Sequence, residues 1–433
     1  MKTEYEKNVS TLNSSSKMDR NARLAIITSL LGWTLVNIDN SFFTFSYLQI
    51  MDELHLSINQ ISYIYTFIFV VGAVASFVAG PIMDNVGRKW VFQLALVFTA
   101  IGSVLSGISW SFASLLGFRS VTQVGASTEL MAGQVMVAEN TPNNTRGWWI
   151  GFAQIGWPVG WFIASLLSMA ILPVFGWRVL FFLGIVPVLF VMWARRNVKE
   201  SERFAELEKV KKAQTEVTTE YKVNKSKAKE FTYKQLFSSD LIRTTVLVTL
   251  WQLVFNIGVG GIISWLPSVF MNYKIDETGL FTATAIATGV SIIGYLSAAY
   301  LGEKFGRREI GAIYMLIGGI AGYFLGFHAT DYTSIVIWYS IFYFFGVGSQ
   351  GVNIAFSVEV FPTRVRGSGS SLVSGAAWLG FILAGLSGPI FFNRFGVSGA
   401  VFIWTCLLMV ISLLCALGCK RVKPGASLEE IAS

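Results

Sequence analysis

Charged residues are scarce in this chain, and that scarcity excludes most classes of soluble protein. Only 13% of the 433 residues are Asp, Glu, Lys or Arg, whereas a soluble globular domain carries about 25%. Hydrophobic residues make up 53% of the chain, and the mean hydropathy is +0.58. Because a bilayer core about 30 Å thick needs about 20 apolar residues per helix, the recurring apolar stretches predict membrane-spanning helices.

Cysteine and histidine are also rare, which argues against metal or redox chemistry. Cys406, Cys415 and Cys419 lie in the last apolar stretch without the spacing of a zinc or redox site. The histidines, His55 and His328, have no ligand-type partner. We therefore expect no metal, no cofactor, no disulfide framework and no enzymatic activity. An ATP-driven pump is disfavoured because the polar segments contain no G-x-x-x-x-G-K-[ST] loop.

The apolar stretches predict an all-α membrane protein with twelve spans. Their ranges are 24–50, 58–83, 89–109, 112–138, 147–171, 178–194, 242–271, 279–302, 309–328, 333–357, 368–392 and 398–419. One long polar linker, 195–241, separates a bundle of six helices over 24–194 from a second over 242–419. Short tails at 1–23 and 420–433 complete the predicted domains.

Basic residues gather in alternate loops and predict the topology. Arg88, Arg146, Arg195, Arg307 and Arg366 fall on one side with most other loop cations, and the opposite side has few. Positively charged loops stay in the cytoplasm, so both tails and the linker are predicted there, in a cell membrane. The formal net charge of +8 therefore reflects topology and not nucleic-acid binding.

The two predicted bundles contain an internal repeat. The loop Gly80–Lys89, after the second span, recurs as Ala299–Arg308 after the eighth, 219 residues later. The loop Glu139–Gly147, after the fourth span, recurs as Glu359–Gly367 after the tenth, 220 residues later. Repeated halves around a midplane site are typical of secondary transporters.

These loops resemble those of the major facilitator superfamily, and the resemblance covers the whole chain. Gly80–Lys89 matches that superfamily's G-x-x-x-D-x-x-G-R-K signature, with Asn85 in place of the usual Arg. The resemblance implies two six-helix bundles, alternating access around a central cavity, and a monomer that binds a small molecule. It also implies a cytoplasmic gate; the alternative is that the loops only anchor topology. The implied gate residues are Asp84, Gly87, Arg88, Lys89, Glu139, Arg146, Glu303, Gly306, Arg307, Arg308, Glu359 and Arg366.

Two further segments resemble proton symporters of organic acids. Trp33–Phe43 is similar to the W-T-x-D-x-x-D-F-F segment of lactate- and sialate-type symporters, with Val36 in place of one acid. Phe118–Glu129 is similar to the F-R-x-x-x-G-x-G-x-G-G-E segment of organic-acid symporters. The C-terminal Ser427–Ile431 instead matches the S-L-E-E-I of sugar porters, while the seventh span departs from their motif.

Three ionisable residues lie well inside the predicted spans: Asp39, Arg119 and Glu129. Each costs about 2.5–3.5 kcal/mol to insert, so such residues indicate function. The depths of Asp39 and Arg119 differ by only ~6 Å at 1.5 Å per residue, which predicts a direct pair. Protonating Asp39 would free Arg119 to bind a substrate carboxylate; the alternative is a permanent ion pair. Glu129 is predicted as a second proton site, an inner-gate partner or a structural residue.

Polar and tryptophan side chains within the spans are candidates to line a cavity. A buried amide needs a hydrogen-bond partner, which a substrate or a neighbouring helix can supply. The segment Gln154–Gly160 also carries Pro158 and predicts a helix bend. The candidate substrate-binding residues besides Arg119 are Asn37, Asn40, Gln123, Gln154, Trp157, Gln252, Asn256, Gln350, Asn353 and Trp378.

Together these patterns predict proton-coupled uptake of a small organic acid, such as a monocarboxylate or an aromatic acid. One alternative is a sugar or polyol porter, which the C-terminal motif favours. Others are an exporter of amphipathic compounds and a membrane sensor that binds its ligand without moving it.

Overall fold

The computed structural model describes residues 20–141, 146–186, 189–190, 236–239, 241–361 and 366–421. The two tails, most of the predicted linker 195–241 and the loops after the fourth and tenth spans lie outside these ranges. So do the side chains of Asp84, Arg88, Glu139 and Glu359. The predicted domain boundaries at the linker therefore stay predictions.

The first half of the chain folds into helices that match its six predicted spans. These are α2 (Arg20–Glu53), α3 (Ile58–Val86), α4 (Arg88–Gly107), α5 (Phe112–Asn140), α6 (Arg146–Gln154), α7 (Gly156–Phe175), α8 (Trp177–Phe182) and the 3₁₀ turn η1 (Leu183–Ile185).

The second half repeats this order. Its elements are α12 (Ile242–Ser264), α13 (Leu266–Asn272), α14 (Glu277–Phe305), α15 (Arg307–Phe327), α16 (Tyr332–Phe342), the π-turn η2 (Tyr343–Val347), α17 (Gln350–Glu359), α18 (Arg366–Phe402), the π-turn η3 (Ile403–Leu407) and α19 (Leu408–Gly418). Within α18 the backbone breaks at Gly396 (φ 68°, ψ 178°), which separates the eleventh span from the twelfth.

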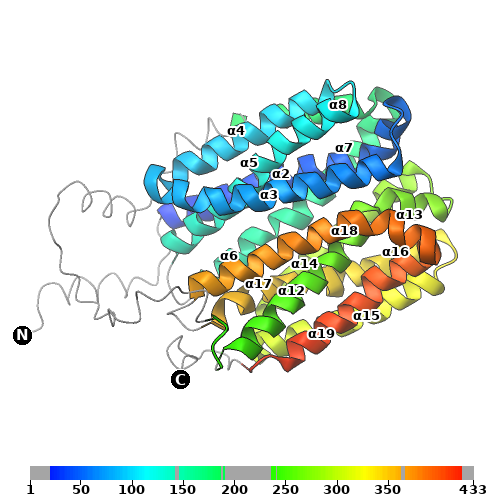
Figure 1. The fold of residues 1–433 in the computed structure, drawn as a ribbon. Coiled ribbons are helices and arrows are strands. Elements are labelled where there is room, and N and C mark those ends of the chain that lie inside the picture. The colour runs from blue at the N-terminus through cyan, green and yellow to red at the C-terminus, as the bar shows by residue number, and fades with distance from the viewer. Residues whose placement is uncertain are drawn as a thin grey trace, which may run out of the picture.

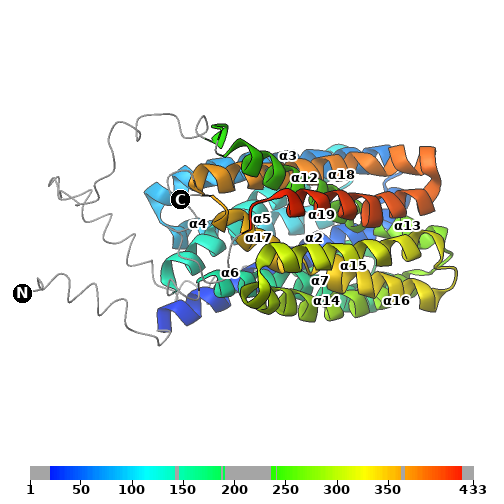
Figure 2. The ribbon, with the colours of Figure 1, turned by 90° about the horizontal axis from the view of Figure 1, so that it is seen from below.

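The helices form two bundles that lie side by side, one from each half of the chain (Figures 1 and 2). α2 begins at the same end of the molecule as the one where α19 ends, as an even number of spans requires. We refer to this as the predicted cytoplasmic end and to the opposite one as the predicted outer end. The fold is thus the predicted all-α arrangement of twelve spans in two six-helix bundles.

Eight stretches of described residues are both long and apolar enough to cross a bilayer. One of them, Leu372–Gly418, contains two spans because it runs through the break at Gly396. α2 and α5 are not among the eight. These helices carry Asp39, Arg119 and Glu129. The helices that contain the buried charged residues therefore have lower hydropathy than the eight stretches.

Glycines with positive φ terminate helices at equivalent points of the two halves. Gly87 (φ 102°) joins α3 to α4, and Gly306 (φ 107°) joins α14 to α15. Gly176 (φ 72°) ends α7, and Gly396 (φ 68°) makes the break in α18. Residues with a Cβ rarely adopt this conformation. Gly87 and Gly306 therefore make tight turns at equivalent points, and the internal repeat is present in the backbone.

Several spans predicted as single helices are interrupted, among them the twelfth, which contains η3. The fifth divides into α6 and α7, and the seventh into α12 and α13. Pro158 and Pro267 lie just after these breaks, and a proline ring clashes with the carbonyl four residues earlier, at Gln154 and Ile263. The tenth span is interrupted by η2 without a proline. Of these interruptions, only the bend in the fifth span was predicted.

Candidate functional site

Asp39 of α2 and Arg119 of α5 form a buried ion pair. The Nη1 atom of Arg119 lies 2.7 Å from the Oδ2 atom of Asp39, and the two side chains are 1% and 3% exposed. The Nη2 atom of Arg119 donates a 3.3 Å hydrogen bond to the Oδ1 atom of Asn40. The proximity expected from the depths of these residues is therefore present.

Aromatic rings surround the guanidinium of Arg119. Its Cζ atom lies 5.1 Å from the ring centre of Phe43 and 5.5 Å from that of Phe181 on α8. Such contacts stabilise a desolvated cation by about 2 kcal/mol. The Oδ1 atom of Asp39 and the Nε atom of Arg119 nevertheless have no hydrogen-bond partner. The pair is therefore firmly held, but its polar atoms are only partly satisfied.

Tyr65 of α3 connects the surroundings of this pair to the second bundle. Its ring lies 5.0 Å from that of Phe43 and 6.0 Å from that of Trp265. Its hydroxyl forms a 3.0 Å hydrogen bond with the Oγ1 atom of Thr44. Phe43 and Tyr65 were not predicted as site residues because aromatic residues in an apolar stretch look like any other core residue.

Glu129 is buried separately from the ion pair. Its side chain is 0% exposed, and neither carboxyl oxygen has a hydrogen-bond partner. A methyl group on Gly32 of α2 would come within 2.5 Å of Oε1 and within 2.7 Å of Phe92 on α4. Glu129 is therefore enclosed by tightly packed helices of the first bundle, and no described charged residue compensates it.

Two groups of candidate cavity residues lie where the bundles meet. The ring of Trp157 on α7 stacks on Tyr295 of α14 and Tyr343 of η2, with centroids 6.5 and 6.4 Å apart. Gly72 of α3 faces the amide of Gln123 on α5 and the indole of Trp378 on α18. The structure thus brings the residues of each group into contact, and most of these residues are aromatic.

Asn37 and Asn256 occupy equivalent positions in the two bundles. The Nδ2 atom of each donates a 2.7 Å hydrogen bond to the carbonyl four residues earlier, in Trp33 and Gln252 respectively. A Cβ atom on Gly160 would lie 2.7 Å from the Cβ of Asn37, and one on Gly380 would lie 2.8 Å from that of Asn256. The same close packing contact between the first and fifth helices thus occurs in each half.

The ion pair, in contrast, is confined to the first half. The offset that relates Asn37 to Asn256 places Gly258 at the position of Asp39. α5 and α16 begin at equivalent caps, Ser111 and Asp331, and counting from them places the buried Tyr339 at the position of Arg119.

The other candidate cavity residues lie on different helices and do not form a group. Gln154 ends α6 and is 7% exposed. The Oδ1 atom of Asn353 has no hydrogen-bond partner and faces Gly311 of α15, inside the second bundle. The Oε1 atom of Gln350 also lacks a partner. Their predicted role in substrate binding remains a prediction.

Charge pairs of the predicted cytoplasmic gate are described around Glu303, Arg307 and Arg308 in the second half. Arg307 lies 3.8 Å from Glu303 one turn earlier on the chain. Arg308 pairs instead with Glu309, at 3.0 Å, and donates a 2.9 Å hydrogen bond to the carbonyl of Cys419. Glu309 was not predicted because the repeat pointed to Glu303. The side chains of the other charged gate residues lie outside the described parts; these are Arg146, Arg366, Asp84, Arg88, Glu139 and Glu359.

Hydrogen bonds join the two bundles at the predicted outer end. The hydroxyls of Tyr47 and Ser268 lie 2.6 Å apart, and the Nε2 atom of Gln49 donates to Glu277 at 3.2 Å. Deeper in the membrane, the hydroxyl of Ser62 donates a 2.8 Å bond to the carbonyl of Gly385. The outer end is therefore closed in this conformation.

Known proteins share this sequence pattern and fold. The chain is 27% identical over 390 residues to a putative niacin/nicotinamide transporter of Bacillus subtilis, which covers 90% of this chain and 92% of that protein. It is 25% identical over 354 residues to a cis,cis-muconate transport protein of Acinetobacter baylyi, covering 80% and 82%. The inward-open xylose transporter of E. coli has a TM-score of 0.71 at 17% identity, covering 95% and 98%.

The family model described as the Major Facilitator Superfamily matches residues 24–358 and 282–432. Those two matches overlap and together span nearly all of the chain beyond its first tail. With the two six-helix bundles and the internal repeat, they show that this chain belongs to the major facilitator superfamily of membrane transporters.

Proposed function

We propose that this transporter carries a small organic acid together with a proton, and that Asp39 and Arg119 couple the two movements. The observation behind the proposal is the buried ion pair with unsatisfied atoms on both partners. Removing one member of such a pair leaves an uncompensated charge that costs several kcal/mol. A proton on Asp39 therefore makes a substrate carboxylate the natural replacement partner for Arg119.

In the proposed cycle the predicted outer end, which is closed in this conformation, first opens to the outside. A proton neutralises Asp39, and the guanidinium of Arg119 loses its counter-ion. An incoming carboxylate can then accept a bidentate pair of hydrogen bonds from Arg119, an arrangement that suits this planar cation. Because Arg119 is only 1% exposed here, the aromatic residues Phe43 and Tyr65 must move for the acid to reach it.

The names of related proteins support an acid as the substrate. Relatives are named as transporters of niacin, cis,cis-muconate and sialic acid, and all three compounds carry carboxylic acid groups. The stacked Trp157, Tyr295 and Tyr343 between the bundles add flat apolar surface that suits an unsaturated or aromatic acid. The proposed location is a cell membrane with both tails cytoplasmic, as the loop charges predict.

A thermal-shift screen distinguishes this function from sugar transport. Purified protein is mixed with organic acids, sugars or amines at a mildly acidic and a mildly alkaline pH. A ligand at 100 times its dissociation constant stabilises by about 2.7 kcal/mol. We expect organic acids to raise Tm, and to do so more strongly at acidic pH, since the proposal has the acid bind together with a proton. Stabilisation by neutral sugars alone would show that the acid proposal is wrong.

Glu129 is proposed as a second proton carrier, because an ionised carboxylate without partners is far more costly to bury than a neutral one. We expect Glu129→Gln to leave Tm unchanged, since glutamine resembles the neutral acid in shape, and to alter the pH dependence of uptake. The control is Asp52→Asn, an exposed acid near the end of α2. A large fall in Tm for Glu129→Gln would contradict the assignment, as would a wild-type pH profile.

A further inference from the structure

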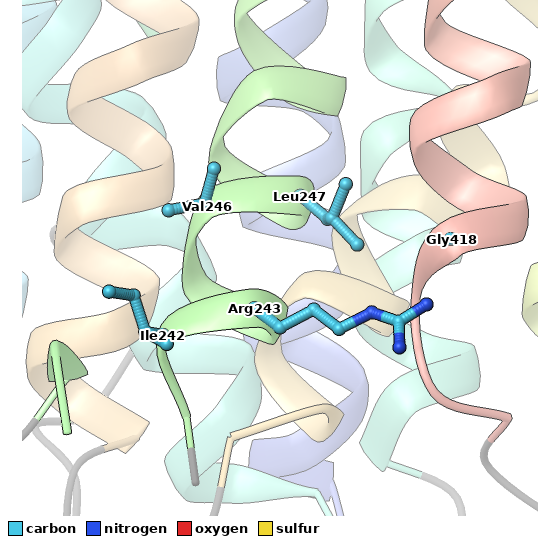
Figure 3. Close-up of a pocket in the computed structure, with 5 residues that line it drawn as sticks. All are labelled: Ile242, Arg243, Val246, Leu247 and Gly418. Carbon is cyan, nitrogen blue, oxygen red and sulfur yellow. The ribbon is translucent and has the colours of Figure 1, made fainter. Parts of the chain in front are cut away.

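A groove with one basic and several apolar side chains lies on the surface of the second bundle, away from the proposed coupling site. It has a volume of 430 Å³ and lies between α12 and α19, near the predicted cytoplasmic end. Figure 3 shows its lining residues. They are Ile242, Arg243, Val246, Leu247 and Gly418.

The apolar side chains of the groove face the membrane. Ile242 is 44% exposed and Val246 is 41% exposed, which in a bilayer means contact with acyl chains. Gly418 lets α19 approach α12 closely, since a Cβ on it would lie 3.0 Å from Leu247. The walls of the groove therefore suit a hydrocarbon chain better than a soluble anion.

Arg243 supplies a cation at one end of these apolar walls. Its side chain extends from α12 toward α19, on the same side as Leu247 (Figure 3). It is exposed and forms no ion pair with any residue that the structure describes. A guanidinium at the end of a membrane helix is suited to bind phosphate oxygens.

The surroundings of Arg243 are positively charged. Arg308 lies at the same corner, where it donates a 2.9 Å hydrogen bond to the carbonyl of Cys419 at the end of α19. Lys420 and Arg421 follow directly in the chain. The Oε1 atom of Glu309 forms ion pairs with both Arg308 and Arg421, each at 3.0 Å. Within the described residues, the cations at this corner thus outnumber the acids.

We propose that this groove binds an anionic glycerophospholipid, with the headgroup phosphate on Arg243 and an acyl chain along Val246 and Leu247. The combination of a guanidinium without an ion-pair partner among the described residues, a local excess of positive charge and an adjoining apolar wall matches both parts of such a lipid. Basic pockets between membrane helices recognise anionic headgroups in this way. The site would hold a lipid between α12, the first helix of the second bundle, and α19, its last.

The test measures Tm of the full chain in detergent while phosphatidylglycerol or phosphatidylcholine is added in mixed micelles. We expect phosphatidylglycerol to raise Tm at lower concentration than phosphatidylcholine. Arg243→Gln should weaken the phosphatidylglycerol effect about fivefold, since one basic residue near an anionic headgroup contributes ~1 kcal/mol. The matched control is Arg394→Gln, an exposed arginine at the predicted outer end, which should respond as the wild type does.

A second variant, Leu247→Phe, fills the groove without changing charge and should weaken the effect of the lipid as well. Equal responses of Arg243→Gln and wild type to phosphatidylglycerol would overturn the proposal. Equal stabilisation by both lipids would also overturn it, because the headgroup charge would then be irrelevant. Inorganic phosphate forms a third arm: if it reproduces the full shift in Tm, the site binds a soluble anion and not a lipid.

Discussion

Asp39→Asn is expected to abolish concentrative uptake driven by a proton gradient, while substrate still equilibrates across the membrane. Asparagine cannot ionise, so the side chain permanently mimics the protonated acid and Arg119 has no anionic partner to return to. A tenfold proton gradient corresponds to 1.36 kcal/mol per proton and would drive about tenfold accumulation in the wild type. In the variant, the accumulation ratio should fall to one.

The measurement uses proteoliposomes with an imposed pH gradient and the radiolabelled form of the acid that most strongly raises Tm. Exchange of labelled for unlabelled acid is followed in parallel to show that the variant still binds and moves substrate. Asp52→Asn is the matched control, since Asp52 is exposed near the end of the same helix. If Asp39→Asn accumulates the acid as the wild type does, the coupling site lies elsewhere.

Arg119→Gln is expected to be strongly destabilising, because it leaves the carboxylate of Asp39 buried without its partner. Breaking a buried ion pair from one side typically costs 3–5 kcal/mol. The double variant Asp39→Asn with Arg119→Gln removes both charges and should recover most of that loss. Thermal unfolding of the four proteins of this cycle in detergent gives the interaction energy directly.

Arg23→Gln, at an exposed position near the start of α2, is the control for removal of an arginine charge. An Arg119→Gln variant as stable as this control would mean that Asp39 is already neutral when the pair is intact. In that case the ion pair at 2.7 Å is not the ionised species on which the coupling proposal depends.

The architecture was predictable because the membrane restricts the possible solutions. Apolar length set the spans, and the repeat between Gly80–Lys89 and Ala299–Arg308 set the division into halves. The orientation inferred from loop charge stays a prediction. The contact between Asp39 and Arg119 followed from the same reasoning, since helix direction and rise fix the depth of every residue. These predictions needed no knowledge of side-chain packing.

Features that depend on packing were not predictable. The rings of Phe43 and Phe181 around Arg119 come from helices that are distant in sequence, and nothing in an apolar stretch distinguishes them from core residues. The choice of Glu309 over Glu303 by Arg308 depends on side-chain direction at the start of α15. Periodicity also could not locate η2, since no proline marks that interruption.

The replacement of the ion pair by Gly258 and Tyr339 in the second half has an evolutionary consequence. Both halves keep the close helix–helix contact between an asparagine and a glycine, at Asn37 and Gly160 and again at Asn256 and Gly380. The packing of the first helix on the fifth is therefore the same in each half. If the pair couples transport, the residues that couple proton and substrate movement all lie in the first half. The other half is then free to diversify, and chimeras that exchange it between relatives should acquire new cargo while remaining driven by protons.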